Sequence, residues 1–268
     1  MSRTNKNPKV SVLTPIYNTD PLHLKEAIES ILNQTYKDFE FIILNDSPDN
    51  IKIEKIVLDY QKKDKRIKYF KNEKNLGITP SRNKLIDLAS GEYLAIFDHD
   101  DISLPNRLKL EVEYLDSHLN VGVVSGQVHN FIKNRITKHP ENNMDIKIAL
   151  MKHNIVSHTA MMLRKSVLDK YSIRYEENYS PAEDYMLVLR LVKYTMFYNI
   201  PKVLLKYRNF DGNTSHIQKE KMFNASELCS NFIMKEYPYL YAKLKTYFFK
   251  RIFIKMKIKR KLKKQKDF

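Results

Sequence analysis

Apolar residues in the first hundred positions alternate between short continuous runs and helical spacing. The continuous runs predict four buried strands, at Lys9–Thr14, Phe39–Asn45, Ile67–Lys71 and Tyr93–Phe97. Apolar residues three and four positions apart predict helices between them, at Pro21–Gln34, Ile51–Lys63 and Thr79–Ala89. Strand–helix repeats with short loops favour the α/β class, with a Rossmann-like, mostly parallel sheet flanked by helices. Ligands in such folds bind beyond the carboxyl ends of the strands, where polar residues become candidates for a site.

The pattern is less regular after residue 103. Helices are expected at Leu104–Leu119, Asp145–His153, Lys165–Tyr171 and Glu183–Lys193, and again from Lys219 onward. Strands are expected at Val121–Val128, Thr159–Leu163, Tyr198–Ile200 and Val203–Tyr207. A single large α/β domain with a helical C-terminal extension follows from this pattern.

The formal net charge of +16 is concentrated at the C-terminal end of the 268 residues. Residues 243–268 hold twelve of the 47 bases and one of the 31 acids, whereas the preceding residues hold 35 bases and 30 acids. A basic tail attracts polyanions, and both anionic lipid and nucleic acid qualify. A nucleic-acid-binding protein would instead show a basic stripe with aromatic residues on its folded body, which this nearly balanced body does not predict.

The remaining composition narrows the setting of the protein. A single cysteine, Cys229, excludes an internal disulfide and a thiolate metal cage, so a reducing, cytoplasmic compartment is expected. The polar N-terminal residues predict no secretory signal, and no apolar stretch is long enough to span a bilayer. With five glycines the chain has no GxGxxG or Walker A loop, so a bound diphosphate would be held in another way, for which a metal bound by carboxylates is the obvious candidate.

The segment Asp98-His99-Asp100-Asp101 supplies such carboxylates directly after an apolar strand. Three carboxylates in four residues repel one another unless a cation or hydrogen-bond donors compensate, which favours a metal or ligand site. The alternative is a polar turn in which Asp101 caps the next helix.

Three further segments carry candidate chemistry. Asp46, in Asn45-Asp46-Ser47, either accepts hydrogen bonds from a base or ribose or caps the following helix. Arg82 lies near a helix start, where a phosphate meets free amides, or is a surface residue. Glu183 and Asp184 open a helix, where acids are common for dipole reasons but where a general base is equally well placed.

Taken in order, these segments resemble family 2 inverting glycosyltransferases, which have the A-type glycosyltransferase fold. The resemblance is carried by Pro15-Ile16-Tyr17-Asn18, Asn45-Asp46-Ser47, Asn75–Asn83, Asp98–Asp101 and Glu183-Asp184, and by Tyr207-Arg208 to Ser215. It covers roughly residues 9 to 216. It implies a catalytic domain over 1–216, with a nucleotide-binding half at 1–103 and an acceptor-binding half at 104–216. Residues 217–268 then form the helical, basic extension.

The resemblance also implies roles for individual residues. Pro15 and Tyr17 would line the nucleotide pocket, Asp46 would contact uracil or ribose, and Arg82 the base or diphosphate. Asp98 would bind the ribose side and Asp100 would ligate the metal. Asp184 would be the catalytic base, with Glu183 contacting the acceptor or holding that base. The family's commonest second-strand pattern, two acids followed by Gly-Ser, is replaced here by Asn45-Asp46-Ser47-Pro48, which puts the role of Asn45 in doubt.

Two histidines stay open between direct and structural roles. His158 precedes a predicted strand where relatives place acceptor- or donor-site residues, and His216 follows Ser215, where some relatives supply a metal or phosphate ligand. Lone histidines more often have structural or solvent-facing positions. His216 joins Asp100 as a candidate metal ligand.

The implied reaction moves a sugar, with inversion, from a nucleoside-diphosphate sugar to a hydroxyl of a glycan acceptor. A UDP-linked hexose or N-acetylhexosamine is the expected donor, and Mn²⁺ or Mg²⁺ the expected cofactor. The basic tail suggests peripheral attachment to the anionic inner face of the cytoplasmic membrane, with a lipid-linked glycan, lipopolysaccharide, lipo-oligosaccharide or capsule as acceptor and no nucleic-acid partner. A nucleotidyltransferase on a similar fold is the remaining alternative, although this sequence lacks the Gly-rich phosphate loop that such an enzyme is expected to have.

Overall fold

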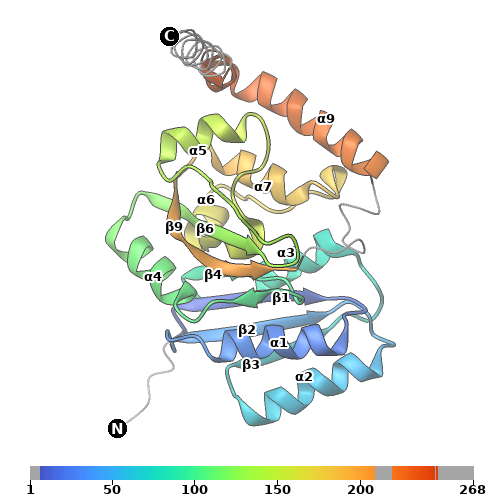
Figure 1. Cartoon of the computed structure of the whole chain (residues 1–268). Helices are drawn as coiled ribbons and strands as arrows, with labels where there is room; N and C mark the ends of the chain where they lie inside the picture. Colours follow the sequence, from blue (N-terminus) through green and yellow to red (C-terminus); the bar gives the residue numbers. More distant parts are fainter. Residues whose placement is uncertain (1–6, 209–218, 245, 247–268) are drawn as a thin grey trace, which may run out of the picture.

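The computed structural model describes residues 7–208, 219–244 and 246 of the chain. Its first half forms four parallel strands in the order β3-β2-β1-β4 (Figure 1). They are β1 (Val10–Ile16), β2 (Phe39–Asn45), β3 (Ile67–Lys71) and β4 (Tyr93–Ile96). Every residue of β1, β2 and β4 is buried, as their continuous apolar runs predicted.

The second half continues the same sheet with mixed strand directions. Beyond β4 the order is β8-β6-β9-β5, and β7 pairs with β6. These strands are β5 (Ile102–Ser103), β6 (Val121–Asn130), β7 (Arg135–Ile136), β8 (Met162–Arg164) and β9 (Met196–Tyr207). β8 runs antiparallel to both β4 and β6, whereas β6 and β9 are parallel. The predicted Rossmann-like, mostly parallel sheet is therefore confirmed.

Helices cover both faces of this sheet, and each face has its own apolar cluster. One cluster packs α1 (Pro21–Leu32), α2 (Ile51–Lys63) and α4 (Arg107–Ser117) against the strands. The other packs α3 (Ile78–Leu88), α5 (Asn143–Leu150), α6 (Lys165–Lys170), α7 (Glu183–Leu191) and α9 (Lys219–Glu236). Two 3₁₀ turns, His158–Ala160 and Glu177–Tyr179, lie on the loops before β8 and α7. None of the helices described is both long and apolar enough to cross a bilayer.

The C-terminal helix α9 packs on the body of the protein. Its buried residues Ala225, Cys229 and Ile233 lie in the same cluster as the apolar residues of α7. Just beyond the helix, the Tyr237 hydroxyl donates to the carbonyl of Leu189 at 2.7 Å. Most of the basic tail, residues 245 and 247–268, lies outside the described residues.

Three details of the second half differ from the predicted elements. Val203–Tyr207 and Tyr198–Ile200 belong to one strand, β9, because a register shift against β6 accommodates Pro201, which cannot donate to a ladder. The predicted strand at Thr159–Leu163 begins as a 3₁₀ turn and becomes extended only at Met162. The helix expected from Leu104 starts at Arg107, because the Leu104 amide donates to the Leu204 carbonyl at 2.9 Å and so continues the pairing of β5 with β9.

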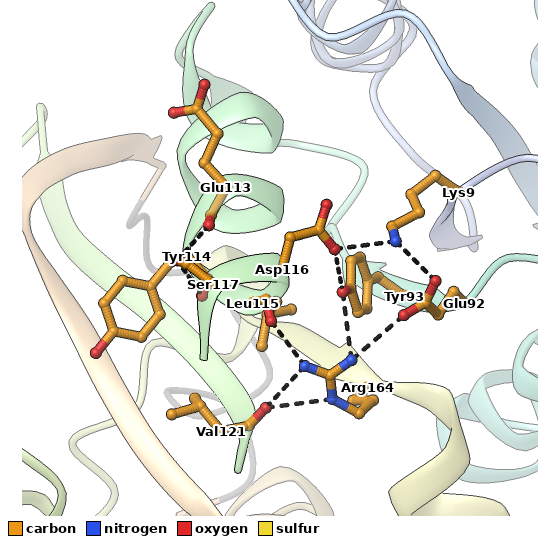
Figure 2. Close-up of polar contacts among 10 residues, drawn as sticks. All are labelled: Lys9, Glu92, Tyr93, Glu113, Tyr114, Leu115, Asp116, Ser117, Val121 and Arg164. Carbon is orange, nitrogen blue, oxygen red and sulfur yellow. Dashed lines mark hydrogen bonds and ion pairs between the residues drawn. The ribbon is translucent and has the colours of Figure 1, made fainter. Parts of the chain in front are cut away.

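An ion-pair network ties the amino ends of β1 and β4 to the end of α4 and to β8 (Figure 2). Lys9 Nζ lies 2.8 Å from Glu92 Oε2 and 2.9 Å from Asp116 Oδ1, and Arg164 reaches Glu92 Oε1 at 3.3 Å. Arg164 also donates to the Leu115 carbonyl at 2.8 Å. Two basic and two acidic side chains thus balance one another where β1 and β4 begin, at the opposite end of β4 from the acidic cluster.

A second polar group lies inside the core, at the other end of β4. Arg107 and Glu111, one turn apart on α4, are both fully buried, with Nε and Oε2 3.3 Å apart. Arg107 also donates to the carbonyl of Ile96 at 2.8 Å and to that of Met161 at 3.4 Å. Burial raises the pKa of Glu111 to about 7, against the attraction of Arg107. This arginine therefore fixes the backbone immediately before the acidic cluster.

We expect Arg107→Met to lower the free energy of unfolding by about 3–5 kcal/mol, because it leaves the Glu111 carboxylate buried without a partner. The loss should be smaller at low pH, because Glu111, whose pKa is about 7 even beside Arg107, takes up a proton there and no charge is stranded. Urea denaturation followed by circular dichroism at pH 6 and pH 8 measures this. The double variant Arg107→Met/Glu111→Leu should recover part of the loss, and equal stability of single and double variants at pH 8 would contradict the explanation.

Candidate active site

The Asp46 carboxylate, directly after β2, holds the chain that leads into α3. Its Oδ1 accepts hydrogen bonds from Asn72 Nδ2 at 2.7 Å and from the Leu76 amide at 2.8 Å, and its Oδ2 accepts from the Gly77 amide at 2.9 Å. Gly77 has a φ of +88°, which L side chains rarely adopt. The alternative that Asp46 caps the next helix is wrong, because Asn50 caps α2.

A cavity of about 680 Å³ opens beside Asp46 at the carboxyl ends of β1 and β2. Tyr17, with 51% of its surface exposed, and Asn18 form one side of it. Ser47, Asp49, Asn50, Glu73, Lys74 and Asn75 are among its other lining residues. Pro15 is buried within β1 and is not part of this lining. Two of the predicted nucleotide residues, Tyr17 and Asp46, therefore share one cavity of ligand size.

Arg82 of α3 joins the two halves of the chain. Its NH1 donates to Glu183 Oε1 at 2.7 Å, and its NH2 lies 3.5 Å from Asp98 Oδ1. Its side chain is only 12% exposed, so the reading of Arg82 as a surface residue is wrong. The guanidinium also lies over the Tyr175 ring, with 5.6 Å between its central carbon and the ring centroid.

The acidic cluster follows β4, as predicted, and its members have different environments. Burial opposes ionisation of Asp98, but attraction from Arg82, the largest opposing effect, leaves the pKa of Asp98 below its usual value. Burial raises the pKa of Asp100, and the charge of Asp98 adds to this effect. The Asp98 amide donates to the Thr159 hydroxyl at 3.0 Å, which fixes the start of the cluster against the segment before β8.

Asp101 is fully buried and anchors the end of β9. Its Oδ1 accepts from the Arg208 amide at 2.9 Å, while the Arg208 side chain donates to the Asp100 carbonyl at 2.9 Å and to Glu26 at 2.6 Å. Burial, with Asp100 and Asp98 close by, raises the pKa of Asp101 well above its usual value. The alternative that Asp101 caps the next helix is wrong, because α4 starts after Asn106.

Asp184 lies on the first turn of α7, beside Glu183. Its Oδ1 accepts from the Tyr185 amide at 2.7 Å and its Oδ2 from Asn154 Nδ2 at 3.3 Å. Burial, and then repulsion from Glu183, raises the pKa of Asp184 to about 6. One oxygen of Glu183, Oε2, is buried and has no hydrogen-bond partner among the residues that the structure describes. The helix start thus presents an aspartate of raised pKa next to a glutamate that is paired with Arg82.

The structure describes one of the two candidate histidines, His158. His158 is buried, and its Nε2 lies 2.8 Å from the Tyr175 hydroxyl. Burial, followed by the charge of Arg82, lowers the pKa of His158 to about 3, so its ring is neutral at pH 7. His158 therefore contacts Tyr175, whose ring lies against the Arg82 guanidinium. His216, the second predicted metal ligand, lies outside the described residues.

The chemistry of the acidic cluster fits a hard divalent cation. Carboxylate oxygens suit Mg²⁺ and Mn²⁺, which need only one or two of them where substrate phosphates complete the shell. Asp98 and Asp100 supply two such groups two residues apart, and repulsion among the three acids is a reason for a cation to bind. In residues 7–208, 219–244 and 246 no three His, Cys, Asp or Glu side chains come together as a complete metal cage.

The family follows from comparison with known proteins. The sequence model described as Glycosyl transferase family 2 matches residues 11–172, more than half of the chain. The chain belongs to glycosyl transferase family 2. It is 39% identical over 238 residues to an uncharacterized glycosyltransferase of Methanocaldococcus jannaschii, covering 86% of this chain and 81% of that protein. The resemblance stated from the sequence motifs is therefore confirmed.

Other relatives and solved structures agree with this assignment. The minor teichoic acid biosynthesis protein GgaB of Bacillus subtilis is 31% identical over 82% of this chain, which spans only 25% of that protein. S. aureus TarS in complex with UDP-GlcNAc superimposes with a TM-score of 0.67 at 21% identity, over 84% of this chain and 66% of that one. The mannosyltransferase PcManGT of Pyrobaculum calidifontis, solved with GDP-Man and Mn²⁺, gives 0.67 at 17% identity, over 90% and 70%. The family 2 chain thus has the A-type glycosyltransferase fold.

Several residues of the site were not identified from the sequence. Asn72 contacts Asp46, Thr159 contacts the Asp98 amide, and Asn154 contacts Asp184. Each is a single polar residue in a loop, with no spacing that separates it from other loop residues. The one available signal was position, since Asn72 directly follows the third predicted strand and so lies at the same sheet edge as Asp46.

We expect Asp46→Asn to weaken binding of uridine diphosphate by about tenfold or more, because an amide cannot accept all three hydrogen bonds and leaves an N–H unsatisfied beside the cavity. Isothermal titration calorimetry measures this. Asp49→Asn is the matched control, since it removes the same charge from an exposed residue of the same cavity. Equal losses in the two variants would show that charge alone, and not the held loop, determines binding.

Proposed function

We propose that this family 2 member is a metal-dependent inverting glycosyltransferase that moves a sugar from a nucleoside-diphosphate donor to a glycan hydroxyl. The observation that carries the proposal is the position of Arg82, which contacts Asp98 of the acidic cluster and Glu183 beside Asp184. The Arg82 guanidinium thus lies between the proposed donor-side and acceptor-side acids. The negative diphosphate of a leaving group would need charge compensation at this place.

In the proposed reaction, Asp184 accepts the proton of the acceptor hydroxyl. The hydroxyl oxygen bonds to the anomeric carbon from the face opposite the nucleoside diphosphate, which leaves with the electron pair of the broken bond, so the configuration inverts. A pKa of about 6 suits this task, because Asp184 is ionised at pH 7 yet more basic than an ordinary aspartate. Glu183 pairs with Arg82 and so positions the guanidinium, whereas Asn154 donates a hydrogen bond to Asp184, the proposed general base.

On the donor side, we assign the nucleoside to the cavity of Tyr17 and Asp46, with Pro15 supporting it from within β1. Asp98 would contact the ribose side and Asp100 would hold the divalent cation, with His216 as a further candidate ligand. When bound there, Mn²⁺ or Mg²⁺ would stabilise negative charge on the diphosphate. The nucleotidyl-transfer alternative lacks a Gly-rich phosphate loop, and the family assignment favours sugar transfer.

The donor and acceptor are proposed from relatives of known chemistry. One structure of the same fold holds UDP-GlcNAc and another holds GDP-Man with Mn²⁺, so we propose a UDP-linked hexose or N-acetylhexosamine and test GDP-mannose against it. The name of the teichoic acid relative supports a cell-surface glycan as acceptor, which includes lipopolysaccharide, lipo-oligosaccharide and capsule.

A donor screen tests the proposal. Purified protein is incubated with UDP-glucose, UDP-galactose, their N-acetylated forms or GDP-mannose, with the methyl glycosides of glucose, galactose and N-acetylglucosamine as acceptors, and released nucleoside diphosphate is measured with Mn²⁺, with Mg²⁺ and with EDTA. We expect release from at least one UDP-sugar, with loss of activity in EDTA. The rate should fall about tenfold per pH unit below pH 6, as Asp184 becomes protonated.

Asp184→Asn is the variant that separates base catalysis from donor binding. It should lower transfer by about 100-fold or more, the usual contribution of a general base, while nucleotide affinity stays close to that of the wild type. Lowered affinity with unchanged kcat would instead place Asp184 in donor binding. Absence of release from every donor would refute the proposed function.

The basic residues at the C-terminal end support a place at the membrane, which we propose is the inner face of the cytoplasmic membrane. Twelve Lys and Arg between residues 243 and 268, each worth about 1 kcal/mol at an anionic surface, are more than enough for attachment. The apolar residues of the stretch 246–254 would add contact with the lipid interface.

Removal of residues 245–268 should abolish sedimentation with vesicles that contain phosphatidylglycerol, and leave donor hydrolysis unchanged. The full chain should bind the same vesicles less at high salt, because its attraction is electrostatic. Vesicles of phosphatidylcholine alone are the control for the lipid charge. Equal sedimentation of full and truncated chains would overturn this assignment.

A further inference from the structure

A second cavity, of about 330 Å³, lies between the start of α7, the loop after α5 and the C-terminal helix α9. Asp184 and Tyr185 of α7 and Asn154 of the loop line one side of it. Met222, Ser226 and Ser230 of α9 line the other side. The carboxylate assigned as the base therefore lies on the wall of a cavity that α9 helps to form.

The residues from α9 form one stripe along the helix. Positions 222, 226 and 230 are four residues apart, so their side chains share a face, and Ile233 continues that face at the buried end. The stripe is held in place because Ala225, Cys229 and Ile233 are buried against the protein body. Ser226 and Ser230 are exposed, so a ligand can reach their hydroxyls.

We propose that this cavity is the acceptor subsite and that α9 recognises one saccharide unit with a free hydroxyl, an assignment that rests on the proposed function. It makes α9 a part of the acceptor site, although the sequence assigned residues from 217 onward to an extension outside the catalytic domain.

The lining matches the chemistry of a sugar ring. Met222, Ile233 and the Tyr185 ring offer apolar surface for the C–H groups of a saccharide, and Asn154, Ser226 and Ser230 offer hydrogen-bonding groups for its hydroxyls. The volume lies at the lower end of the range for ligand sites, which suits a single ring better than an extended chain. A hydroxyl of that ring would lie next to Asp184, where the proposed reaction requires it.

The single buried cysteine of the chain makes a selective test possible. Cys229 is fully buried, so a cysteine introduced on the exposed part of α9 is the group that a thiol reagent reaches first. Ser226→Cys and Ser230→Cys place a thiol on the cavity wall. Asn224→Cys and Asn231→Cys are matched controls on exposed positions of the same helix that do not line the cavity.

Each variant is treated with benzyl methanethiosulfonate, in the presence or absence of the methyl glycosides of glucose, galactose and N-acetylglucosamine. At least one glycoside should slow labelling of Ser226→Cys and Ser230→Cys and leave the controls unchanged. Labelled Ser226→Cys should lose glycoside-stimulated release of nucleoside diphosphate by about tenfold or more relative to labelled Asn224→Cys, and recover when dithiothreitol removes the label.

The subsite assignment is overturned if none of the glycosides protects the cavity positions, if the controls are protected equally, or if the label leaves glycoside-stimulated turnover intact. These results are separate from failure of the proposed function, in which unlabelled wild-type protein releases no nucleoside diphosphate from any donor. The protection measurement needs no donor, so it decides the subsite by itself.

Discussion

The Arg82 guanidinium lies between two carboxylates that come from distant parts of the chain, Asp98 after β4 and Glu183 at the start of α7. A buried cation needs such partners, because removal of its charge from water is costly. The sheet places Asp98, at the end of β4, next to Arg82. The helix α7, which carries Glu183, packs against the same apolar cluster as α3, which carries Arg82. Asp98 and Glu183 are therefore held in a fixed relation by one side chain. Asp184 takes its raised pKa from the same burial and the same neighbour, Glu183.

Much of the first half could be predicted because local pattern and burial coincide there. The apolar runs of β1, β2 and β4 are buried over their whole length, and the candidate residues Tyr17 and Asp46, which follow β1 and β2, line one cavity. Prediction was weaker where tertiary pairing decides the structure. Tyr198–Ile200 and Val203–Tyr207 were predicted as separate strands, whereas they form one strand in which a shift in register against β6 accommodates Pro201. Asp101 looked like a helix cap because its partner, the Arg208 amide, is 107 residues away.

The candidate site was predicted by residue type better than by role. Arg82, Asp98, Glu183 and Asp184 were all selected, and the structure brings them together. Their hydrogen-bond partners Asn72, Thr159 and Asn154 were missed, since each is a lone polar residue in a loop. The contribution of α9 was missed for a different reason. The helix belongs to the C-terminal segment whose overall basic charge suggested an extension outside the catalytic domain, and only its packing on α7 shows that Met222, Ser226 and Ser230 line the same cavity as Asp184.

The contacts of Arg208 have a consequence for how such sequences can diverge. Its guanidinium joins Glu26 of α1 to the backbone of Asp100, and its amide is held by Asp101. A change of Glu26 to a neutral residue would leave the positive charge of Arg208 less well compensated. A simultaneous change of Arg208 to a neutral residue would remove that charge. Positions 26 and 208, separated by most of the domain, should therefore covary among homologues that keep the acidic cluster. Such covariation would record a spatial contact that neither residue's sequence neighbourhood reveals.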